Sequence, residues 1–153
     1  MVKLKNLNID EICADNFTSF RQESELLEKD GDFEKVFLFK KQYIIKIFRH
    51  RKIFSTSRIK NKAKKFRDNS IVLQQRGISC SEVCKIFNLT KPNKRQCIVY
   101  KYIDGETFHD VYINANIEDK ELLLRKFFDF FKLLHKKGIY FRSAHLANII
   151  VRP

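Results

Sequence analysis

The chain has 153 residues, 44% of them hydrophobic and 15 of them Phe, which supplies enough apolar surface for one domain or two small lobes. Only 4 Gly and 2 Pro occur, which excludes a linker-rich or low-complexity protein. No apolar run approaches the length of a bilayer span, and the opening MVKLKNLNIDEI lacks the apolar centre of a signal peptide. We therefore expect a cytoplasmic protein.

The charge is strongly basic, with 31 Lys and Arg against 18 Asp and Glu, a net charge of +13. Twelve Lys or Arg and no acid lie between Lys40 and Arg67, at positions 40, 41, 46, 49, 51, 52, 58, 60, 62, 64, 65 and 67. Such a block attracts phosphates, anionic lipid headgroups or nucleic acid. The alternative is a solvated helix face without a partner.

The four cysteines form no CxxC pair, and no His follows them at zinc-ligand spacing. This pattern predicts reduced, mostly buried thiols and no metal site. The residues are Cys13, Cys80, Cys84 and Cys97.

Residues 1–30 carry mixed signals, and we treat them as an N-terminal extension in which FTSFRQESELLEK favours a short helix. The turn KDGD at 29–32 leads into FEKVFLF, and KKQ at 40–42 separates that run from YIIKIF. Two β-rich runs joined by a short polar turn predict an antiparallel hairpin. Both runs are apolar at successive residues, so we expect the sheet to be covered on at least one face.

A helix is predicted after the hairpin, with the Ser55–Thr56–Ser57 cluster at its start and Gly77 at its end. Its apolar or small residues recur at alternating spacings of four and three, which marks one helix face. They are Ile59, Ala63, Phe66, Ser70 and Leu73. The stretches SEVCKIFNL and NKRQCIVYKYIDG then predict two further strands, the second ending at Gly105.

A long helix is predicted from Ile117 to Lys137, with Asn116 as its cap, acids in its first turn and Gly138 as its stop. Leu and Phe nearly encircle it, which predicts a central, buried helix. A polar loop and a short strand follow. The predicted fold class is α+β.

Three stretches combine polar and apolar residues. YIIKIF contains one charged residue, Lys46, and strand alternation points it away from Ile45 and Ile47. VYKYIDG, at 99–105, is a hydrophobic run that ends in an acid and Gly. GIYFRSAHLANIIV, at 138–151, inserts four polar side chains between apolar blocks: Arg142, Ser143, His145 and Asn148.

These motifs and the element order resemble the protein-kinase-like fold over roughly residues 30–153. Within that superfamily the chain is similar to bacterial lipopolysaccharide-core kinases and the toluene tolerance protein family. The resemblance implies a kinase-like N-lobe with its hinge at 31–105, an antiparallel sheet plus one helix. It implies the first part of a helical C-lobe at 106–153.

The resemblance also implies residue roles. Lys46 would contact the nucleotide phosphates, and backbone groups near Val99 to Lys101 would meet the adenine. In the H-R-D-L-x-x-x-N motif, Arg142 matches the Arg, Ser143 the catalytic Asp and Asn148 the metal-binding Asn. His145 falls near the transferred phosphate. The implied cofactors are ATP and Mg²⁺, and the implied substrate is an acidic glycolipid or envelope sugar at the inner membrane.

The chain departs from the family pattern at the catalytic position. The hydroxyl of Ser143 cannot act as a base near neutral pH, and His145 is the nearby titratable group able to replace it. The alternative for His145 is a histidine at the core edge that bonds only to backbone.

Other departures concern charge and metal. The sole acid between Lys40 and Ser81, Asp68, lies about 200° from Phe66 on the helix, so the Lys–acid pair of kinases is missing or replaced. Asn69 or Ser70 is better placed to face inward. Only Gly31 stands near a phosphate loop, and no metal-binding Asp motif follows Asn148.

Three hypotheses remain open. The first is an ATP-dependent phosphotransferase for a lipopolysaccharide-core sugar, and the second is a non-catalytic, pseudokinase-like binding protein. The third is a basic module for anionic membrane or nucleic acid; nucleic acid is disfavoured because the Phe residues follow core periodicities. Without a second lobe, the 117–137 helix would lack cover, which predicts self-association.

Overall fold

The computed structural model describes residues 12–48, 62–89, 95–141 and 145–152. It confirms the α+β fold class, with a five-stranded antiparallel sheet and helices. The chain divides into unit 1, residues 1–72 and 80–102, and unit 2, residues 73–79 and 103–153. The boundary near the hinge thus lies at 102/103, inside the VYKYIDG stretch.

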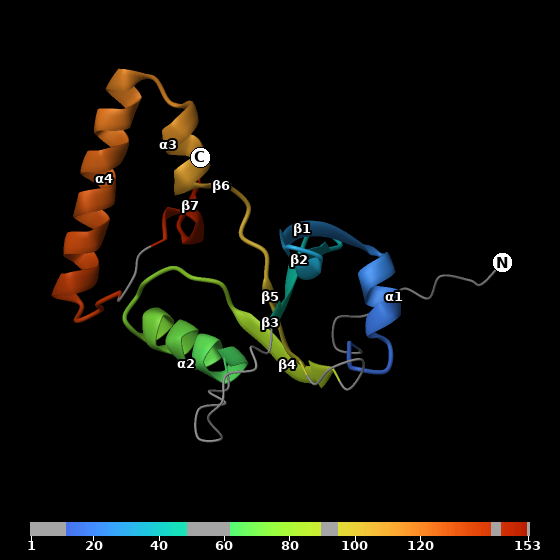
Figure 1. The fold of residues 1–153 in the computed structure, drawn as a ribbon. Helices are drawn as coiled ribbons and strands as arrows, with labels where there is room; N and C mark the ends of the chain where they lie inside the picture. Colours follow the sequence, from blue (N-terminus) through green and yellow to red (C-terminus); the bar gives the residue numbers. More distant parts are fainter. Residues whose placement is uncertain (1–11, 49–61, 90–94, 142–144, 153) are drawn as a thin grey trace. The chain divides into compact units, whose positions relative to one another are not determined.

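Unit 1 contains the larger sheet, in the order β1-β2-β3-β5-β4, and Figure 1 labels its elements. The predicted hairpin is confirmed, with Phe39 opposite Tyr43. Helix α2 lies in the chain between β3 and β4. The elements are α1 Phe17–Gln22, β1 Ser24–Asp30, β2 Phe33–Phe39, β3 Tyr43–Phe48, α2 Lys62–Gln75, β4 Val83–Leu89 and β5 Arg95–Lys101.

Strand β1 corrects the sequence prediction for residues 24–30. We placed this segment in an N-terminal extension with helical character, but it is the first strand of the sheet and pairs with β2. The letters SELLEKD are mostly good helix formers. Pairing with β2 and the packing of Leu26 on the core outweigh that local preference.

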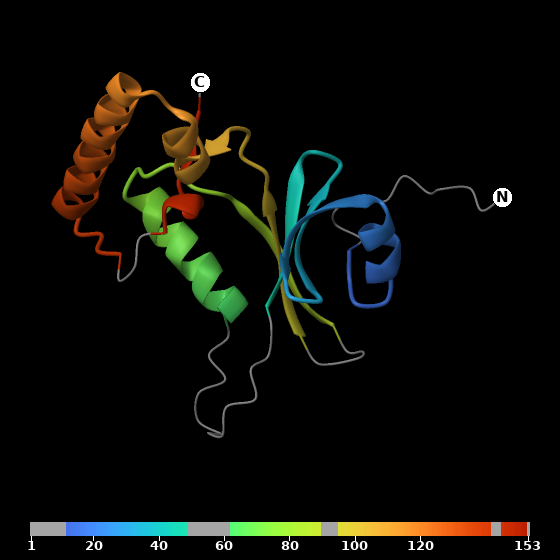
Figure 2. The same cartoon turned by 45° about the horizontal axis from the view of Figure 1, so that its top comes forward.

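The sheet is covered on both faces, as Figures 1 and 2 show with α1 on one side and α2 on the other. The α1 face holds the main core, in which Phe20 is fully buried and its ring centroid lies 5.0 Å from that of Phe39. On the α2 face, Phe66 stacks on Tyr100 at 5.2 Å, and Ala63 is fully buried. The other buried residues of the core on the α1 face are Ile12, Phe37, Ile45, Ile47, Leu89, Cys97 and Val99.

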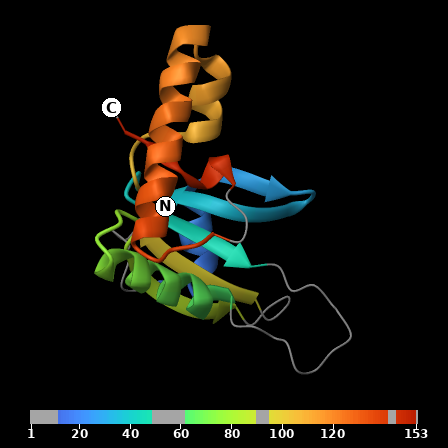
Figure 3. The same ribbon diagram turned by 90° about the vertical axis from the view of Figure 1, so that its left-hand side faces the viewer.

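Unit 2 contains a two-stranded sheet and the remaining helices. Strand β6 (Glu106–Thr107) pairs with β7 (Ile150–Val151), and the 3₁₀ helix η2 (Leu146–Asn148) lies just before β7. Helix α3 (Phe108–Asn114) was not predicted. Figure 3 shows it beside the first half of α4 (Ile117–Lys136), where Phe108 contacts Phe127 at 5.0 Å.

Helix α4 matches the predicted bounds to within a residue, and the side chain of Asn116 caps it by accepting from the Asp119 amide at 2.8 Å. The prediction that it is buried is wrong. Leu134 is its only buried residue, in a small cluster with Ile78 and Ile139, while Ile117 is 87% and Phe128 59% exposed. The described elements that pack on α4 cover one side of the helix. Its apolar side chains extend around the helix beyond that covered side.

The thiols are more exposed than predicted. Cys97 is buried, Cys13 and Cys80 are half-buried, and Cys84 is exposed. Of the helices in the described segments, none is long and apolar enough to span a bilayer.

Candidate functional site

Lys46 lies on the α2 face of the sheet, half-buried, in the middle of β3. Its cross-strand neighbours are Val36 on β2 and Ile98 on β5. Directly paired residues of an antiparallel sheet share a face, so these apolar side chains flank the lysine. The alternation that predicted Lys46 to point away from Ile45 and Ile47 is confirmed, because both isoleucines belong to the core on the α1 face.

An acid from β1 stands in the same row as Lys46. Glu28 pairs with Val36, and Val36 pairs with Lys46, so the three residues cross three neighbouring strands on one face. The β1–β2 register shifts on either side of Glu28. These irregularities leave Leu27 and Lys35 without direct cross-strand partners, and Lys35 forms an ion pair with Glu28.

The electrostatics of this row follow from burial and charge. Burial lowers the pKa of the Lys46 ammonium, the Lys35 charge lowers it further, and the Glu28 carboxylate opposes both. On the same face, burial and then the Glu28 charge raise the pKa of the Tyr100 phenol to about 12. A desolvated ammonium gains more from an anionic ligand than a solvated one does. The Lys46 ammonium is therefore the anion-binding candidate of this row.

Sequence reasoning correctly excluded Asp68 as the partner of Lys46. Asp68 is exposed on α2 and pairs with the neighbouring Arg67 at 3.2 Å. Ser70 is the polar residue of α2 that faces inward, 7% exposed, whereas Asn69 is exposed. Glu28 was missed because the register that places it in the row depends on two register shifts, which no local sequence pattern predicts.

The hinge residues are already engaged within unit 1. The side chain of Val99 is fully buried in the core, and its backbone lies in a strand paired on both sides. The Lys101 amide donates to the Glu82 carbonyl at 2.9 Å, and its ammonium bonds to the Glu82 carboxylate at 2.7 Å. The Tyr102 amide donates to the Gln42 carbonyl at 2.7 Å. The Val99 side chain and the amides of Lys101 and Tyr102 are thus removed from the groups available to an adenine.

The polar loop of unit 2 is described only in part. Arg142 and Ser143 lie outside the described residues. His145 lies directly before η2, and Asn148 is its last residue; both are exposed. The Asn148 amide donates to the His145 carbonyl at 2.9 Å. The turn therefore brings the backbones of these two predicted site residues together within unit 2.

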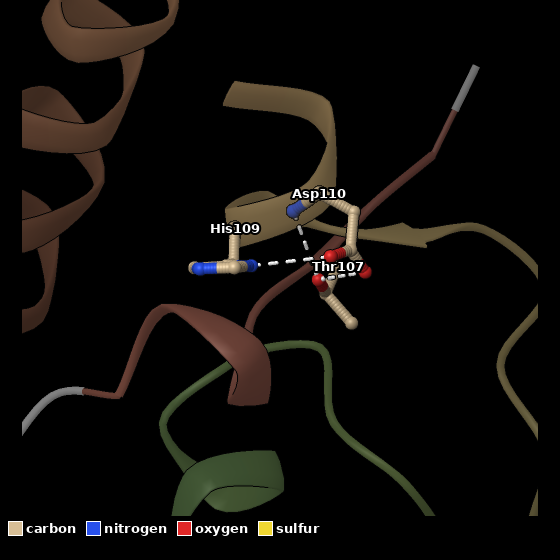
Figure 4. Close-up of polar contacts among 3 residues, drawn as sticks. All are labelled: Thr107, His109 and Asp110. Carbon is tan, nitrogen blue, oxygen red and sulfur yellow. Dashed lines mark hydrogen bonds and ion pairs between the residues drawn. The ribbon is translucent and has the colours of Figure 1, made fainter. Parts of the chain in front are cut away.

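A second polar cluster, drawn in Figure 4, lies at the start of α3. The Thr107 hydroxyl accepts from the Asp110 amide at 3.2 Å and donates to its carboxylate at 2.6 Å, while His109 Nδ1 lies 3.1 Å from that carboxylate. The bond from Thr107 and the contact with His109 lower the pKa of Asp110. The cluster is a helix cap, and its side chains are half-exposed.

The expected magnesium site is not matched by the donors in the described segments. There, no three His, Cys, Asp or Glu side chains gather to hold a metal ion. Asn148 offers one neutral amide oxygen, whereas Mg²⁺ in nucleotide sites takes one or two carboxylates besides the phosphates. The described residues therefore do not fit this ion.

A cavity of about 790 Å³ in unit 1 lies on the α1 face of the sheet, opposite Lys46. Both arginines on its wall already have partners within the chain. Arg21 pairs with Glu34 at 2.5 Å, and the Arg95 guanidinium lies 4.5 Å from the Phe33 ring centroid. These contacts leave the Lys46 face as the better candidate for ligand chemistry.

Compared with family models, curated proteins and solved structures, the chain matches none. The assignment of the candidate site is therefore supported by the geometry of the sheet alone.

Proposed function

We propose that this chain is a kinase-like nucleotide-binding protein in which Lys46 binds the phosphates of ATP. The observation that carries the proposal is the position of Lys46. It is the one charged residue of β3, half-buried between Val36 and Ile98 on the face that α2 covers. The sheet order and the insertion of α2 between β3 and β4 support it, because both agree with a kinase-like N-lobe.

In this proposal Glu28 acts on Lys46 through its charge, while its ion pair is with Lys35. Its carboxylate favours the charged form of Lys46 against burial and against Lys35. The acid thus comes from β1, and α2 contributes Ala63, Phe66 and Ser70 to the same face.

The test is ATP binding measured by calorimetry with the wild type, Lys46→Met and Lys29→Met. Lys29 is a matched control, because it is an exposed lysine on β1 of the same sheet. Loss of one charge-assisted bond should weaken binding about tenfold or more in Lys46→Met, with no comparable change in the control. Absence of saturable binding by the wild type, or equal binding by Lys46→Met, contradicts the proposal.

The same proposal holds that the chain binds ATP without transferring phosphate. Ser143 occupies the position at which kinases have the catalytic Asp. A serine hydroxyl lacks the basicity to take the proton from the hydroxyl group of the acceptor. Purified protein incubated with γ-labelled ATP and lipopolysaccharide-core acceptors should give no labelled product. Labelling that disappears in Lys46→Ala would instead establish the phosphotransferase hypothesis.

An acidic glycolipid is the partner class that the basic block supports. Within its described part, Lys62, Lys64 and Lys65 are exposed on α2. Flotation with vesicles that contain an anionic lipid should show binding that falls as salt is raised. Binding to neutral vesicles that equals binding to anionic ones contradicts this partner.

A further inference from the structure

Helix α4 carries a largely exposed seam, four of whose six residues are apolar, with alternating spacings of four and three. At 100° per residue they fall within an arc of about 80°, and spacing of this kind lets two helices pack side by side. Ile117 is 87% exposed, Phe128 59% and Leu124 37%. The seam consists of Ile117, Glu121, Leu124, Phe128, Phe131 and His135.

The seam borders the side of α4 that packs within unit 2, and the two meet at Phe131, which is half-buried with its ring centroid 4.6 Å from that of Phe127. Leu134 is fully buried with Ile78 and Ile139, and Phe127 packs on Phe108. Near its C-terminal end the seam is extended by two aromatic residues: Tyr140 is 76% exposed and stacks on His135, and Phe141 is 49% exposed. Exposed apolar area that is contiguous in this way marks an interaction surface.

Charged residues lie beside the seam. When their order along the helix is reversed, each sign is replaced by the opposite sign. Along one flank the signs run minus, minus, plus, minus, plus, plus, at Glu118, Glu121, Arg125, Asp129, Lys132 and Lys136. An antiparallel copy centred between residues 126 and 127 sets every charge against one of opposite sign. Glu118 then faces Lys136, Glu121 faces Lys132, and Arg125 faces Asp129.

In a parallel two-fold arrangement this flank would face the opposite flank of the other copy, which carries Leu123, Phe127 and Leu134, so these charges would have no counterpart. Leu124 faces Phe128 in the antiparallel arrangement, twice by symmetry, so the apolar centre also matches itself. A surface of this kind is self-complementary, which is the property of an isologous interface. The order also suits the helix dipole and the ion pairs within the helix, and the charge exchange described below separates that explanation from association.

We propose that two copies of this chain associate through α4, with the two helices antiparallel and their seams in contact. The apolar residues supply the affinity, and the flanking ion pairs set the orientation, because exposed pairs contribute little to affinity. One helix face is smaller than a standard interface of about 800 Å² per partner, so the dimer should be weak and concentration-dependent.

The test is analytical ultracentrifugation of the full 153-residue chain over a wide range of concentrations. The wild type should show a monomer–dimer equilibrium that Phe128→Glu abolishes. The control is Leu133→Glu, because Leu133 is 43% exposed and lies about 140° from Phe128 around the helix. It should leave association unchanged. A wild type that stays monomeric, for instance because another protein covers this face, overturns the proposal.

A charge exchange separates association from helix stability. Glu121→Lys sets like charges against each other at two symmetric places and should weaken the dimer about tenfold at low salt. Adding Lys132→Glu restores both intermolecular pairs, but it leaves like charges inside the helix at 121/125 and at 129/132, where ion pairs of 2.6 Å and 3.1 Å now exist.

The two explanations therefore predict opposite results. If the residues act between copies, the double variant should recover the dimer. If they act only within the helix, the double variant should be worse than the single one. Failure of the double variant to recover, with α4 helicity retained by circular dichroism, overturns the antiparallel arrangement.

Discussion

Glu28 on β1 and Lys46 on β3 lie in one cross-strand row of the sheet, with Val36 between them. Glu28 is also paired with Lys35, so one carboxylate interacts with two lysines. The charge of Lys46 is thus adjusted from within the sheet. This arrangement can be tested without any nucleotide.

Glu28→Gln should lower the pKa of Lys46 further, because it removes the one charge that opposes burial and Lys35. At a fixed pH below that pKa, more of the amine is then neutral. The measurement is the rate of Lys46 acylation as a function of pH, followed by peptide mass spectrometry. Glu25→Gln, an exposed acid on the same strand, is the matched control. An unchanged Lys46 profile in Glu28→Gln contradicts the role given to Glu28 and leaves ATP binding by Lys46 untouched.

The Tyr100 phenol should ionise at a higher pH than a free tyrosine. Its pKa is raised from 10.0 to about 12, by burial first and then by Glu28. The folded state therefore binds its proton more tightly than the unfolded state, so this contribution to stability is present below pH 10 and is lost as pH rises toward 12. Tyrosinate absorbance of the wild type minus that of Tyr100→Phe should show the late step. A difference curve with its midpoint near that of free tyrosine would sink this prediction.

Gly105→Ala should destabilise unit 2 by about 2–4 kcal/mol. Gly105 has φ of +141°, and a Cβ built there would lie 2.4 Å from the Val151 carbonyl oxygen. Gly31→Ala is the matched control, because Gly31 has φ of +62° with nothing within 4 Å of the added carbon. It should cost about 1 kcal/mol.

Hydrogen exchange localises the Gly105 effect. The Phe108 amide donates to the Ile149 carbonyl at 2.7 Å beside the β6–β7 pair. It should exchange faster in Gly105→Ala and normally in Gly31→Ala. Equal exchange in both variants argues against the close approach.

Phe20→Ala should destabilise unit 1 by about 3–5 kcal/mol, because it opens a cavity beneath a fully buried ring. Phe141→Ala removes the same ring from a position that is 49% exposed, and its cost should be clearly smaller. Chemical unfolding followed by circular dichroism gives both values. Similar losses in the two variants would mean that α1 is not part of the core.

Much of the fold could be predicted from local patterns. The two runs of the β2–β3 hairpin, the apolar stripe of α2 and the Asn116 cap of α4 are signals that reside in a few neighbouring residues. Strand β1 could not be predicted in this way, because its strand state comes from pairing with β2. The burial of α4 was overpredicted, because a helix pattern shows which residues are apolar and not what covers them.

For the candidate site, too, local patterns predict some features, whereas others depend on pairing between distant segments. Strand alternation within YIIKIF was enough to give the face of Lys46. The contribution of Glu28 depends on register shifts in two strands. The engagement of Lys101 by Glu82 depends on how β5 and its neighbour are aligned. Both are long-range facts that no single stretch of sequence carries.

The turn between β2 and β3 has an engineering consequence. Lys40 and Lys41 both adopt positive φ, 50° and 54°, in a turn closed by the Gln42 amide on the Phe39 carbonyl at 3.1 Å. Asn-Gly is the pair that such a two-residue turn favours, so replacing both lysines with it should raise the free energy of unfolding by about 1–2 kcal/mol. Gln-Gln, which removes the charges alone, should bring no such gain. The tip of this hairpin is therefore the first place to modify in order to make the protein more stable, since the change leaves the buried residues and Lys46 intact.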